Sequence, residues 1–425
     1  MNILLLIVSL VVIASFGFES LIFILFSTIT TYIAARNLKS KYKKLILIST
    51  IFVNTITLLL VRFNGANLLE IKWLNLLALF GISYYTLLVI SYIVDVYKGK
   101  YEPEKKLFKY ALYVTYIPQL FMGPISKYDE IRDQLSEKRK LTLNNLYEGS
   151  LRIVWGLLKT LVISGRLAVV TSVIAGYTGT YVGCYAFLAM ILYSIQLYCN
   201  FSGGIDIVLG ISKILGIKLT ENFDMPFFSE NIKEFWRRWH ISLGRWLKEY
   251  IYVPLGGNRC GNFRKCINLL ITFTVSGLWH GVHYILWGIG HGIFVMIGDK
   301  GKTKYKWLNR TVTFLIVSFL WSFFIWPDTL TALKMIGGVF TNFNITAVAG
   351  NITSLGLALS DWIIVIVFTA ILFVFDANKT KISEKIKSGS PELKTTLICT
   401  LILVVFVFGV YGFGFNVNEF IYSKF

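Results

Sequence analysis

The stretches WIIVIVFTAILFVF (362–375) and TLICTLILVVFVFGVYGF (396–413) are long and apolar, and the lysine-rich NKTKISEKIK (378–387) lies between them. This pattern indicates the fold class. A bilayer core needs about 20 predominantly apolar residues per crossing helix, so both apolar stretches predict membrane-spanning helices. Lysine-rich loops tend to stay on the cytoplasmic side, so the stretch between the two helices predicts a cytoplasmic loop.

The same pattern continues through the 425-residue chain, for example in LILISTIFVNTITLLL (45–60). The chain is 55% hydrophobic and only 15% charged, with a mean hydropathy of +0.65, whereas a soluble domain usually carries about 25% charged residues. We therefore predict an all-α polytopic membrane protein with about nine to eleven membrane-embedded helices. No polar domain interrupts the apolar blocks, so residues 1–425 are predicted to form a single integral membrane domain.

The formal net charge of +19 is concentrated between the apolar blocks, as in RNLKSKYKK (36–44) and KGKTKYK (300–306). This distribution is typical of cytoplasmic loops that lie against anionic lipid headgroups, and it argues against a nucleic-acid partner. With 376–394 inside, the last apolar block crosses outward and the C-terminal tail, residues 414–425, is predicted to be extracytoplasmic. Residues 1–36 are predicted to form a hairpin around 17–20.

One segment, YIPQLFMGPISKY (116–128), breaks the helical pattern with Pro118, Gly123 and Pro124. Proline removes a backbone donor, and broken backbone at membrane depth is tolerated only inside protein or beside water. We expect a re-entrant segment that lines a cavity; a loop at the membrane interface is the alternative.

A second unusual segment, NIKEFWRRWHISLGRWLKEYIYVPLGGNR (231–259), mixes aromatic and basic residues. As one continuous helix it would be an aromatic, basic interfacial anchor. Anchoring does not explain why a histidine would lie on the apolar face. That face would collect Trp236, Trp239, His240, Leu243, Trp246, Leu247 and Tyr250.

All four histidines lie between positions 240 and 291, and three of them fall within VSGLWHGVHYILWGIGHG (275–292). If that stretch is one helix, His280, His283 and His291 share a broad face. Ionisable residues inside a membrane span are functional candidates by default.

Three interpretations of the histidines compete. Each imidazole could simply be hydrogen-bonded to a neighbour, or two histidines one turn apart could share a metal ion. No carboxylate occurs between Glu249 and Asp299, and the five cysteines form no CxxC pair, so we predict no metal site. The third interpretation is general-base catalysis, because an imidazole titrates near neutral pH and can take a proton from a hydroxyl group.

Four motifs, taken together, resemble those of the membrane-bound O-acyltransferases. They are NFSGGIDIVLG (200–210), WRRWHISL (236–243), PLGGNR (254–259) and GLWHG (277–281). Within that family they are most similar to the bacterial branch that includes the alginate O-acetylase, and the likeness covers residues 75–300. The resemblance implies a catalytic core in 75–300, with helices around a central tunnel and re-entrant and interfacial helices, in a multi-pass protein of the bacterial cell membrane.

The resemblance also implies roles for individual residues. His280 matches the expected catalytic base, His240 matches a second catalytic histidine, and His283 has no strong counterpart and is expected to be structural. FSGGID stands where the family usually has FSGYSD, which alters the expected tunnel wall. The implied tunnel or supporting residues are His291, Trp279, Trp236, Asn200, Ser202 and Pro124.

The ending FIYSKF (420–425) fits the F-x-Y-x-x-F motif of this branch, which implies that Tyr422 is an acyl carrier. The donor would be a cytoplasmic thioester, acetyl-CoA or an acyl carrier protein, with no tightly bound cofactor. The partner would be an extracytoplasmic acyltransferase of the SGNH type or similar. From the residues alone, a tail tyrosine beside phenylalanines is also typical of an interfacial anchor.

The resemblance favours an O-acyltransferase that serves O-acetylation of an extracellular polysaccharide or peptidoglycan. D-alanyl transfer to teichoic acid is the alternative within the family. A channel or transporter would also place polar residues in spans, but transporters tend to carry paired intramembrane acids and repeated halves, and the sequence has neither.

Overall fold

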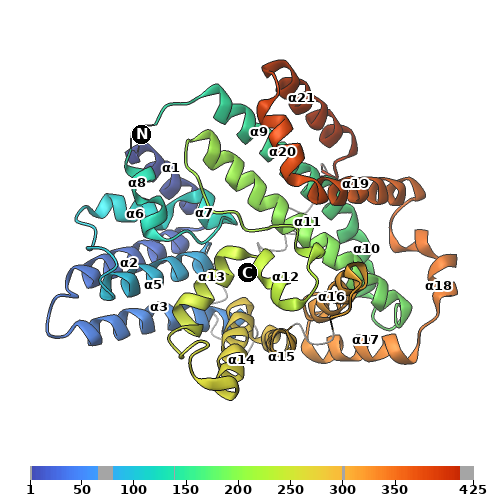
Figure 1. Cartoon of the computed structure of the whole chain (residues 1–425), viewed down its shortest axis with the longest axis horizontal. Helices are drawn as coiled ribbons and strands as arrows, with labels where there is room; N and C mark the ends of the chain where they lie inside the picture. The colour runs from blue at the N-terminus through green and yellow to red at the C-terminus, as the bar shows by residue number, and fades with distance from the viewer. Residues whose placement is uncertain (1, 66–79, 138, 299–301, 412–425) are drawn as a thin grey trace. The chain divides into compact units, whose positions relative to one another are not determined.

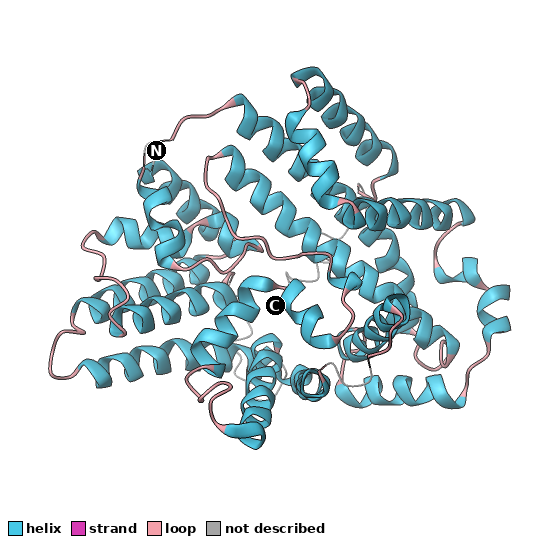
Figure 2. Cartoon of the chain, in the orientation of Figure 1, coloured by secondary structure: helices cyan, strands magenta, loops and turns pink. Residues whose placement is uncertain are grey.

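The computed structural model describes residues 2–65, 80–137, 139–298 and 302–411. Throughout these ranges the chain forms helices joined by loops (Figure 2). The described part has no β-strand beyond one isolated bridge between Phe223 and Trp239. The predicted all-α fold class is therefore confirmed.

Seven helical runs in the described residues are long and apolar enough to cross a membrane, and four shorter apolar helices accompany them (Figure 1). The chain is thus a multi-pass membrane protein. The seven are α2 (Phe18–Arg36), α3 (Lys43–Gly65), the run of α9 (Leu143–Leu157), η1 (Leu158–Ser164) and α10 (Gly165–Gly176), α11 (Cys184–Ile214), α16 (Lys306–Trp321) with η5 (Ser322–Phe324), α19 (Leu359–Ala377) and α21 (Pro391–Phe408). The shorter ones are α1 (Asn2–Ser15), α5 (Ile82–Tyr97), η4 (Val282–Tyr284) with α15 (Ile285–Ile297), and α17 (Thr329–Thr341).

The remaining helices are short or polar, apart from the 20-residue α14. Local sequence explains two of their starts, because the side chain of Asn231 caps α12 and that of Asn344 caps α18. They are α6 (Leu107–Thr115), α7 (Ile117–Phe121), α8 (Tyr128–Ser136), η2 (Pro226–Phe228), α12 (Ile232–Arg238), α13 (Ile241–Leu247), η3 (Lys248–Tyr252), α14 (Gly261–His280), α18 (Ile345–Gly350), η6 (Ile352–Leu355) and α20 (Lys379–Ser388).

The helices group into two compact units that alternate along the chain. Unit 1 comprises 1–146, 211–221 and 242–255, and unit 2 comprises 147–210, 222–241 and 256–425. The prediction of a single integral membrane domain stays a prediction.

Unit 1 contains the predicted N-terminal hairpin, in which α1 and α2 meet at Gly17. It also contains the irregular segment 116–128. Pro118 lies in the first turn of α7, where a missing backbone N–H is not needed. Gln119 and Tyr128 are buried, as are most residues between them, so the segment lies inside the protein and is not an exposed interface loop. The cavity that it was expected to line stays a prediction.

Candidate active site

The histidine-rich stretch is a helical hairpin in unit 2. α14 ends at His280, the backbone turns at Gly281 (φ 151°), and α15 starts at Ile285. The stretch 280–291 is therefore not one continuous helix, so the shared face of the three histidines, which depended on a continuous helix, does not form. The two helices of the hairpin pack closely because glycines lie where they meet. A Cβ on Gly277 would overlap the Tyr284 carbonyl, and a Cβ on Gly288 would overlap the backbone of α14.

This hairpin brings two of the predicted histidines together through one tryptophan. The Trp287 ring lies edge-on to His280, at 5.3 Å between centroids, and to His291, at 5.0 Å. His280 and His291 are both buried. His283 lies in η4, is half-buried, and its carbonyl accepts a hydrogen bond from the Thr329 hydroxyl at 3.3 Å, so it is not part of this pair.

His240 lies in unit 2 at a sharp turn between α12 and α13. Its φ of 46° is in the left-handed region, which is uncommon for a residue with a side chain. Two backbone hydrogen bonds hold the turn: Asp224 N–H to the Arg238 carbonyl (2.9 Å) and Ile241 N–H to the Asn222 carbonyl (3.0 Å).

The segment 231–259 is therefore not the one continuous helix that the interfacial-anchor interpretation assumed. The turn at His240 ends α12 in unit 2, and residues 242–255 belong to unit 1. Because the chain turns there, the His240 side chain points inward, is only 2% exposed, and lies 4.8 Å from the Phe201 ring. Neither of its ring nitrogens is hydrogen-bonded to another residue that the structure describes.

Trp279 connects the two predicted catalytic histidines. Its ring centroid lies 4.7 Å from that of His280 and 6.4 Å from that of His240. Trp236 completes the group from α12, because its Nε1–H donates to Nδ1 of His291 at 3.2 Å. An indole nitrogen can only donate, so Nδ1 of His291 is the unprotonated nitrogen and Nε2 carries the proton. The structure thus gathers His240, His280 and His291 around three tryptophans, of which Trp279 and Trp287 are buried and Trp236 is half-buried.

The other predicted supporting residues have different surroundings. Asn200 is buried next to Phe201, and its Oδ1 has no hydrogen-bond partner among the described residues. Ser202 accepts a hydrogen bond from the Lys159 ammonium at 2.8 Å. Pro124 belongs to unit 1, and its predicted role at the tunnel stays a prediction. Tyr422 lies outside the described residues.

A buried ion cluster in unit 2 was missed at the sequence level. Asp206 accepts from both Lys159 (2.5 Å) and Arg152 (2.9 Å), and the nearby Tyr198 hydroxyl donates to Asp376 at 2.6 Å. The sequence does contain a signal for this cluster, because Lys159 and Asp206 lie inside otherwise apolar spans. Charged side chains are energetically unfavourable in such spans unless they are paired. The cluster joins η1 and α9 to α11, and Phe201 against His240 also comes from α11.

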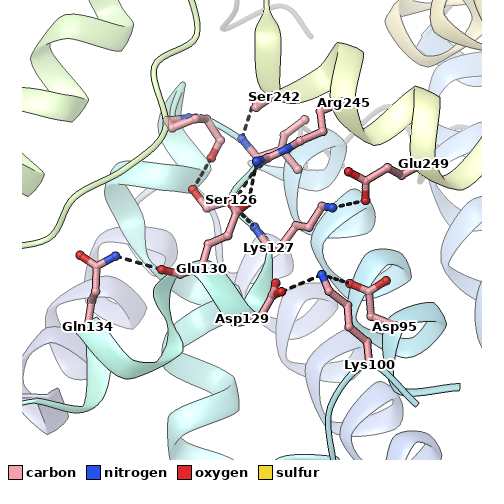
Figure 3. Close-up of polar contacts among 12 residues, drawn as sticks. Asp95, Lys100, Ser126, Lys127, Asp129, Glu130, Gln134, Ser242, Arg245 and Glu249 are labelled. Carbon is pink, nitrogen blue, oxygen red and sulfur yellow. Dashed lines mark hydrogen bonds and ion pairs between the residues drawn. The ribbon is translucent and has the colours of Figure 1, made fainter. Parts of the chain in front are cut away.

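Unit 1 has its own ion cluster around the residues that follow Pro124 (Figure 3). Arg245 forms a fork with Glu130, at 2.5 and 2.9 Å, and Lys127 pairs with Glu249. The Ser242 hydroxyl accepts the Ile125 N–H at 3.0 Å. These contacts hold the start of α8 against α13 and η3.

Lys100 extends the same cluster, with Asp129 at 2.7 Å and Asp95 at 3.3 Å. Burial alone would lower the pKa of Lys100, but the hydrogen bonds and charges of Asp129 and Asp95 outweigh it, so the pKa is raised. Lys100 therefore stays charged. Within the part of the chain that the structure describes, no three His, Cys, Asp or Glu side chains are placed to hold a metal ion.

Buried, aromatic-lined histidines in a multi-pass helical protein are candidates for proton-transfer chemistry. The sequence model of the membrane-bound O-acyltransferase family matches residues 104–327, which is just over half of the chain. The chain belongs to that family. The matched region contains His240, His280 and His291 and both unusual segments.

Individual relatives carry related names. The chain is 37% identical over 268 residues to a probable alginate O-acetylase from Pseudomonas putida, covering 61% of this chain and 55% of that protein. It is 32% identical over 342 residues to a peptidoglycan O-acetyltransferase from Helicobacter pylori, covering 70% and 65%. It is 30% identical over 268 residues to a teichoic acid D-alanyltransferase from Bacillus subtilis, covering 57% and 66%. The matches thus span between about half and two thirds of these relatives.

Proposed function

We propose that this chain is an O-acyltransferase that moves an acetyl group from a cytoplasmic thioester across the membrane, for O-acetylation of an extracellular polysaccharide or peptidoglycan. The observation that carries the proposal is the buried pair His240 and His280, joined through Trp279. Burial among aromatic rings disfavours the charged form of an imidazole, which suits a group that takes up a proton only during the reaction.

The proposed first step is acyl transfer to Tyr422. A phenol has a pKa near 10, so it is a weak nucleophile at neutral pH until a base takes its proton. His280 takes the hydroxyl proton while the phenolic oxygen bonds to the thioester carbonyl carbon. The carbon–sulfur bond then breaks, and the imidazolium returns the proton to the thiolate. His240 orients the acyl carbonyl or relays the proton.

The surroundings of the histidines support this chemistry. Trp279 and Trp287 are both buried beside His280. Such walls exclude water, which would otherwise hydrolyse the thioester, and they hold the reacting groups in register.

The donor and the second transfer are further parts of the proposal. Acetyl-CoA and acyl carrier proteins are anionic, and lysine-rich α20 between α19 and α21 gives the proposed cytoplasmic side a positive charge. An extracytoplasmic acyltransferase of the SGNH type, or a similar one, would then take the acyl group from Tyr422. No tightly bound cofactor takes part.

Transfer of D-alanine to teichoic acid is the second candidate, because a teichoic acid D-alanyltransferase is 30% identical to this chain. Two acetyl-transferring relatives are 37% and 32% identical, which favours acetyl. Membranes containing the chain, supplied with labelled acetyl-CoA or with a D-alanyl carrier protein, separate the two. Label from acetyl-CoA that appears on the chain and is lost in His280→Gln supports the first candidate, and label from the D-alanyl carrier alone supports the second.

A further inference from the structure

The last described helix, α21, is held weakly along its length. Only 11% of its apolar stretch is buried, and its buried side chains are Lys394 and Val405. In a membrane, packing against other helices is what positions a helix relative to its neighbours. The contacts at the C-terminal end of α21 therefore fix the position of the residues that follow the helix.

A buried arginine caps that end. Arg166, near the start of α10, donates through Nη1 to the carbonyl of Phe408, the last residue of α21. The final carbonyls of a helix lack partners within the helix and form the negative end of its dipole, so a cation stabilises them. The Arg166 Nε also pairs with Asp361 in the first turn of α19, at 2.9 Å, which neutralises the buried charge.

A second contact holds the next residues. The Val410 N–H donates to the Leu161 carbonyl at 3.0 Å. Leu161 lies in the π-helical turn η1, and at its end the Gly165 N–H reaches back to the Thr160 carbonyl. A Cβ built on Gly165 would lie 3.4 Å from the Cβ of Val410, so the chain leaving α21 lies directly against the glycine.

We propose that Arg166, Asp361 and Gly165 are positioning residues that fix the point where the chain leaves α21. They thereby set the base from which the C-terminal segment with Tyr422 extends. Four elements of unit 2 meet at this clamp: η1, α10, α19 and α21. Its role in acyl transfer rests on the proposed function of Tyr422, whereas the clamp itself does not.

Tethering explains why a fixed base matters. Tyr422 is twelve residues after Val410, so an extended chain lets it reach at most about 40 Å from there. Within such a radius a tethered group has an effective concentration of about millimolar, and the value falls when the anchor moves. A displaced base lowers the rate of transfer to the chain's own tyrosine without altering the histidine site.

A cross-link tests the contact directly. In the variant with Gly165→Cys and Val410→Cys the two Cβ atoms lie 3.4 Å apart, close to the range of about 3.5–4.5 Å that a disulfide requires. We expect mass spectrometry of oxidised membranes to find the 165–410 disulfide in most molecules. The matched control is Gly176→Cys with Val410→Cys, because Gly176 is in the same helix and has nothing within 4 Å of its Cβ position. Equal cross-linking of the two pairs overturns the clamp.

The same disulfide tests whether the base stays fixed during the reaction. We expect the cross-linked chain to acylate its own C-terminal peptide within about twofold of the reduced form, because locking preserves the proposed working state. A loss of about tenfold or more that is restored by reduction overturns the positioning role, since the base would then have to move.

Release of the clamp gives the converse test. Arg166→Met with Asp361→Leu removes both charges and leaves neither unpaired, so we expect the fold to be retained. We expect acylation of the chain's own tail to fall about tenfold, while acylation of an added peptide with the sequence of 416–425 stays within about twofold. An equal loss in both assays indicates a merely structural role and overturns the proposal. Absence of any acyl group on Tyr422 in the unaltered protein removes the carrier role instead, and leaves the disulfide result standing.

Discussion

The Nε1–H of Trp236 donates to Nδ1 of His291 at 3.2 Å, and the two rings meet edge to face with centroids 4.9 Å apart. The residues come from α12 and α15. This contact ties the helix that leads into His240 to the hairpin that carries His280. One hydrogen bond therefore both fixes a tautomer and joins the two halves of the candidate site.

Trp236→Phe tests that contact, because phenylalanine keeps an aromatic ring but cannot donate. We expect a loss of about 1 kcal/mol in stability and a lower rate of acyl transfer. Thermal unfolding in detergent and the ¹⁵N shifts of the His291 ring measure the two effects. Unchanged ring shifts would show that Trp236 does not set the tautomer.

His280→Gln removes the proposed base and leaves a polar side chain of similar reach. Loss of a general base typically costs about 10²- to 10⁴-fold, so we expect acyl transfer to fall by at least about 100-fold. His283→Gln is the matched control, three residues along the same motif and half-buried. It should change the rate by no more than about twofold. Equal losses in the two variants would contradict the assignment of the base.

The left-handed backbone angle at His240 predicts which substitutions at this position destabilise the protein. Asparagine tolerates φ near 46°, whereas a β-branched residue does not. His240→Asn should therefore keep a melting temperature close to that of the unaltered chain and still lose activity, while His240→Val should lose stability as well. The same melting temperature for both variants would mean that the turn has relaxed.

Glu104 predicts acid sensitivity in unit 1. Its carboxylate accepts from the Lys105 and Lys106 amides (2.8 and 2.9 Å) and from the Tyr128 hydroxyl (2.5 Å). Burial alone would raise the pKa of Glu104, but these hydrogen bonds outweigh it and lower the pKa below 4.5. Its stabilising contribution is thus present above pH 4.5 and is lost as the pH falls through the lowered pKa.

Glu104→Gln checks this directly. The unaltered chain should be more stable than the variant at pH 7, and the difference should shrink as the pH falls below about 4.5. Melting temperatures of both proteins across pH 3 to 7 measure it. A constant difference over that range would show that the carboxylate charge has no part in the stability.

The sequence predicted the helical membrane class because hydrophobic length and lysine-rich loops, as in 362–413, report directly on the bilayer. The sequence did not predict the two positions where a single backbone angle ends a helix and reverses the direction of the chain. Helical periodicity runs through Trp239 and Gly281 alike, but His240 and Gly281 adopt positive φ angles that end the helices. Those turns depend on contacts between distant residues, such as Ile241 with Asn222, which periodicity does not reveal.

The site was predicted in part. The motifs identified His240, His280 and His291, and the structure places them around shared tryptophans. Lys159 and Arg166 were overlooked because each lies in an apolar block, and their acidic partners Asp206 and Asp361 are distant in sequence. Only the packing of the helices shows which charges are paired.

The most direct measurement is mass spectrometry of the C-terminal peptide isolated from cells that make either the unaltered chain or His280→Gln. We expect an acyl group on Tyr422 in the former, identified as acetyl by its mass, and none in the latter at equal protein levels. Acylation of Tyr422 to the same extent in both proteins would contradict the account.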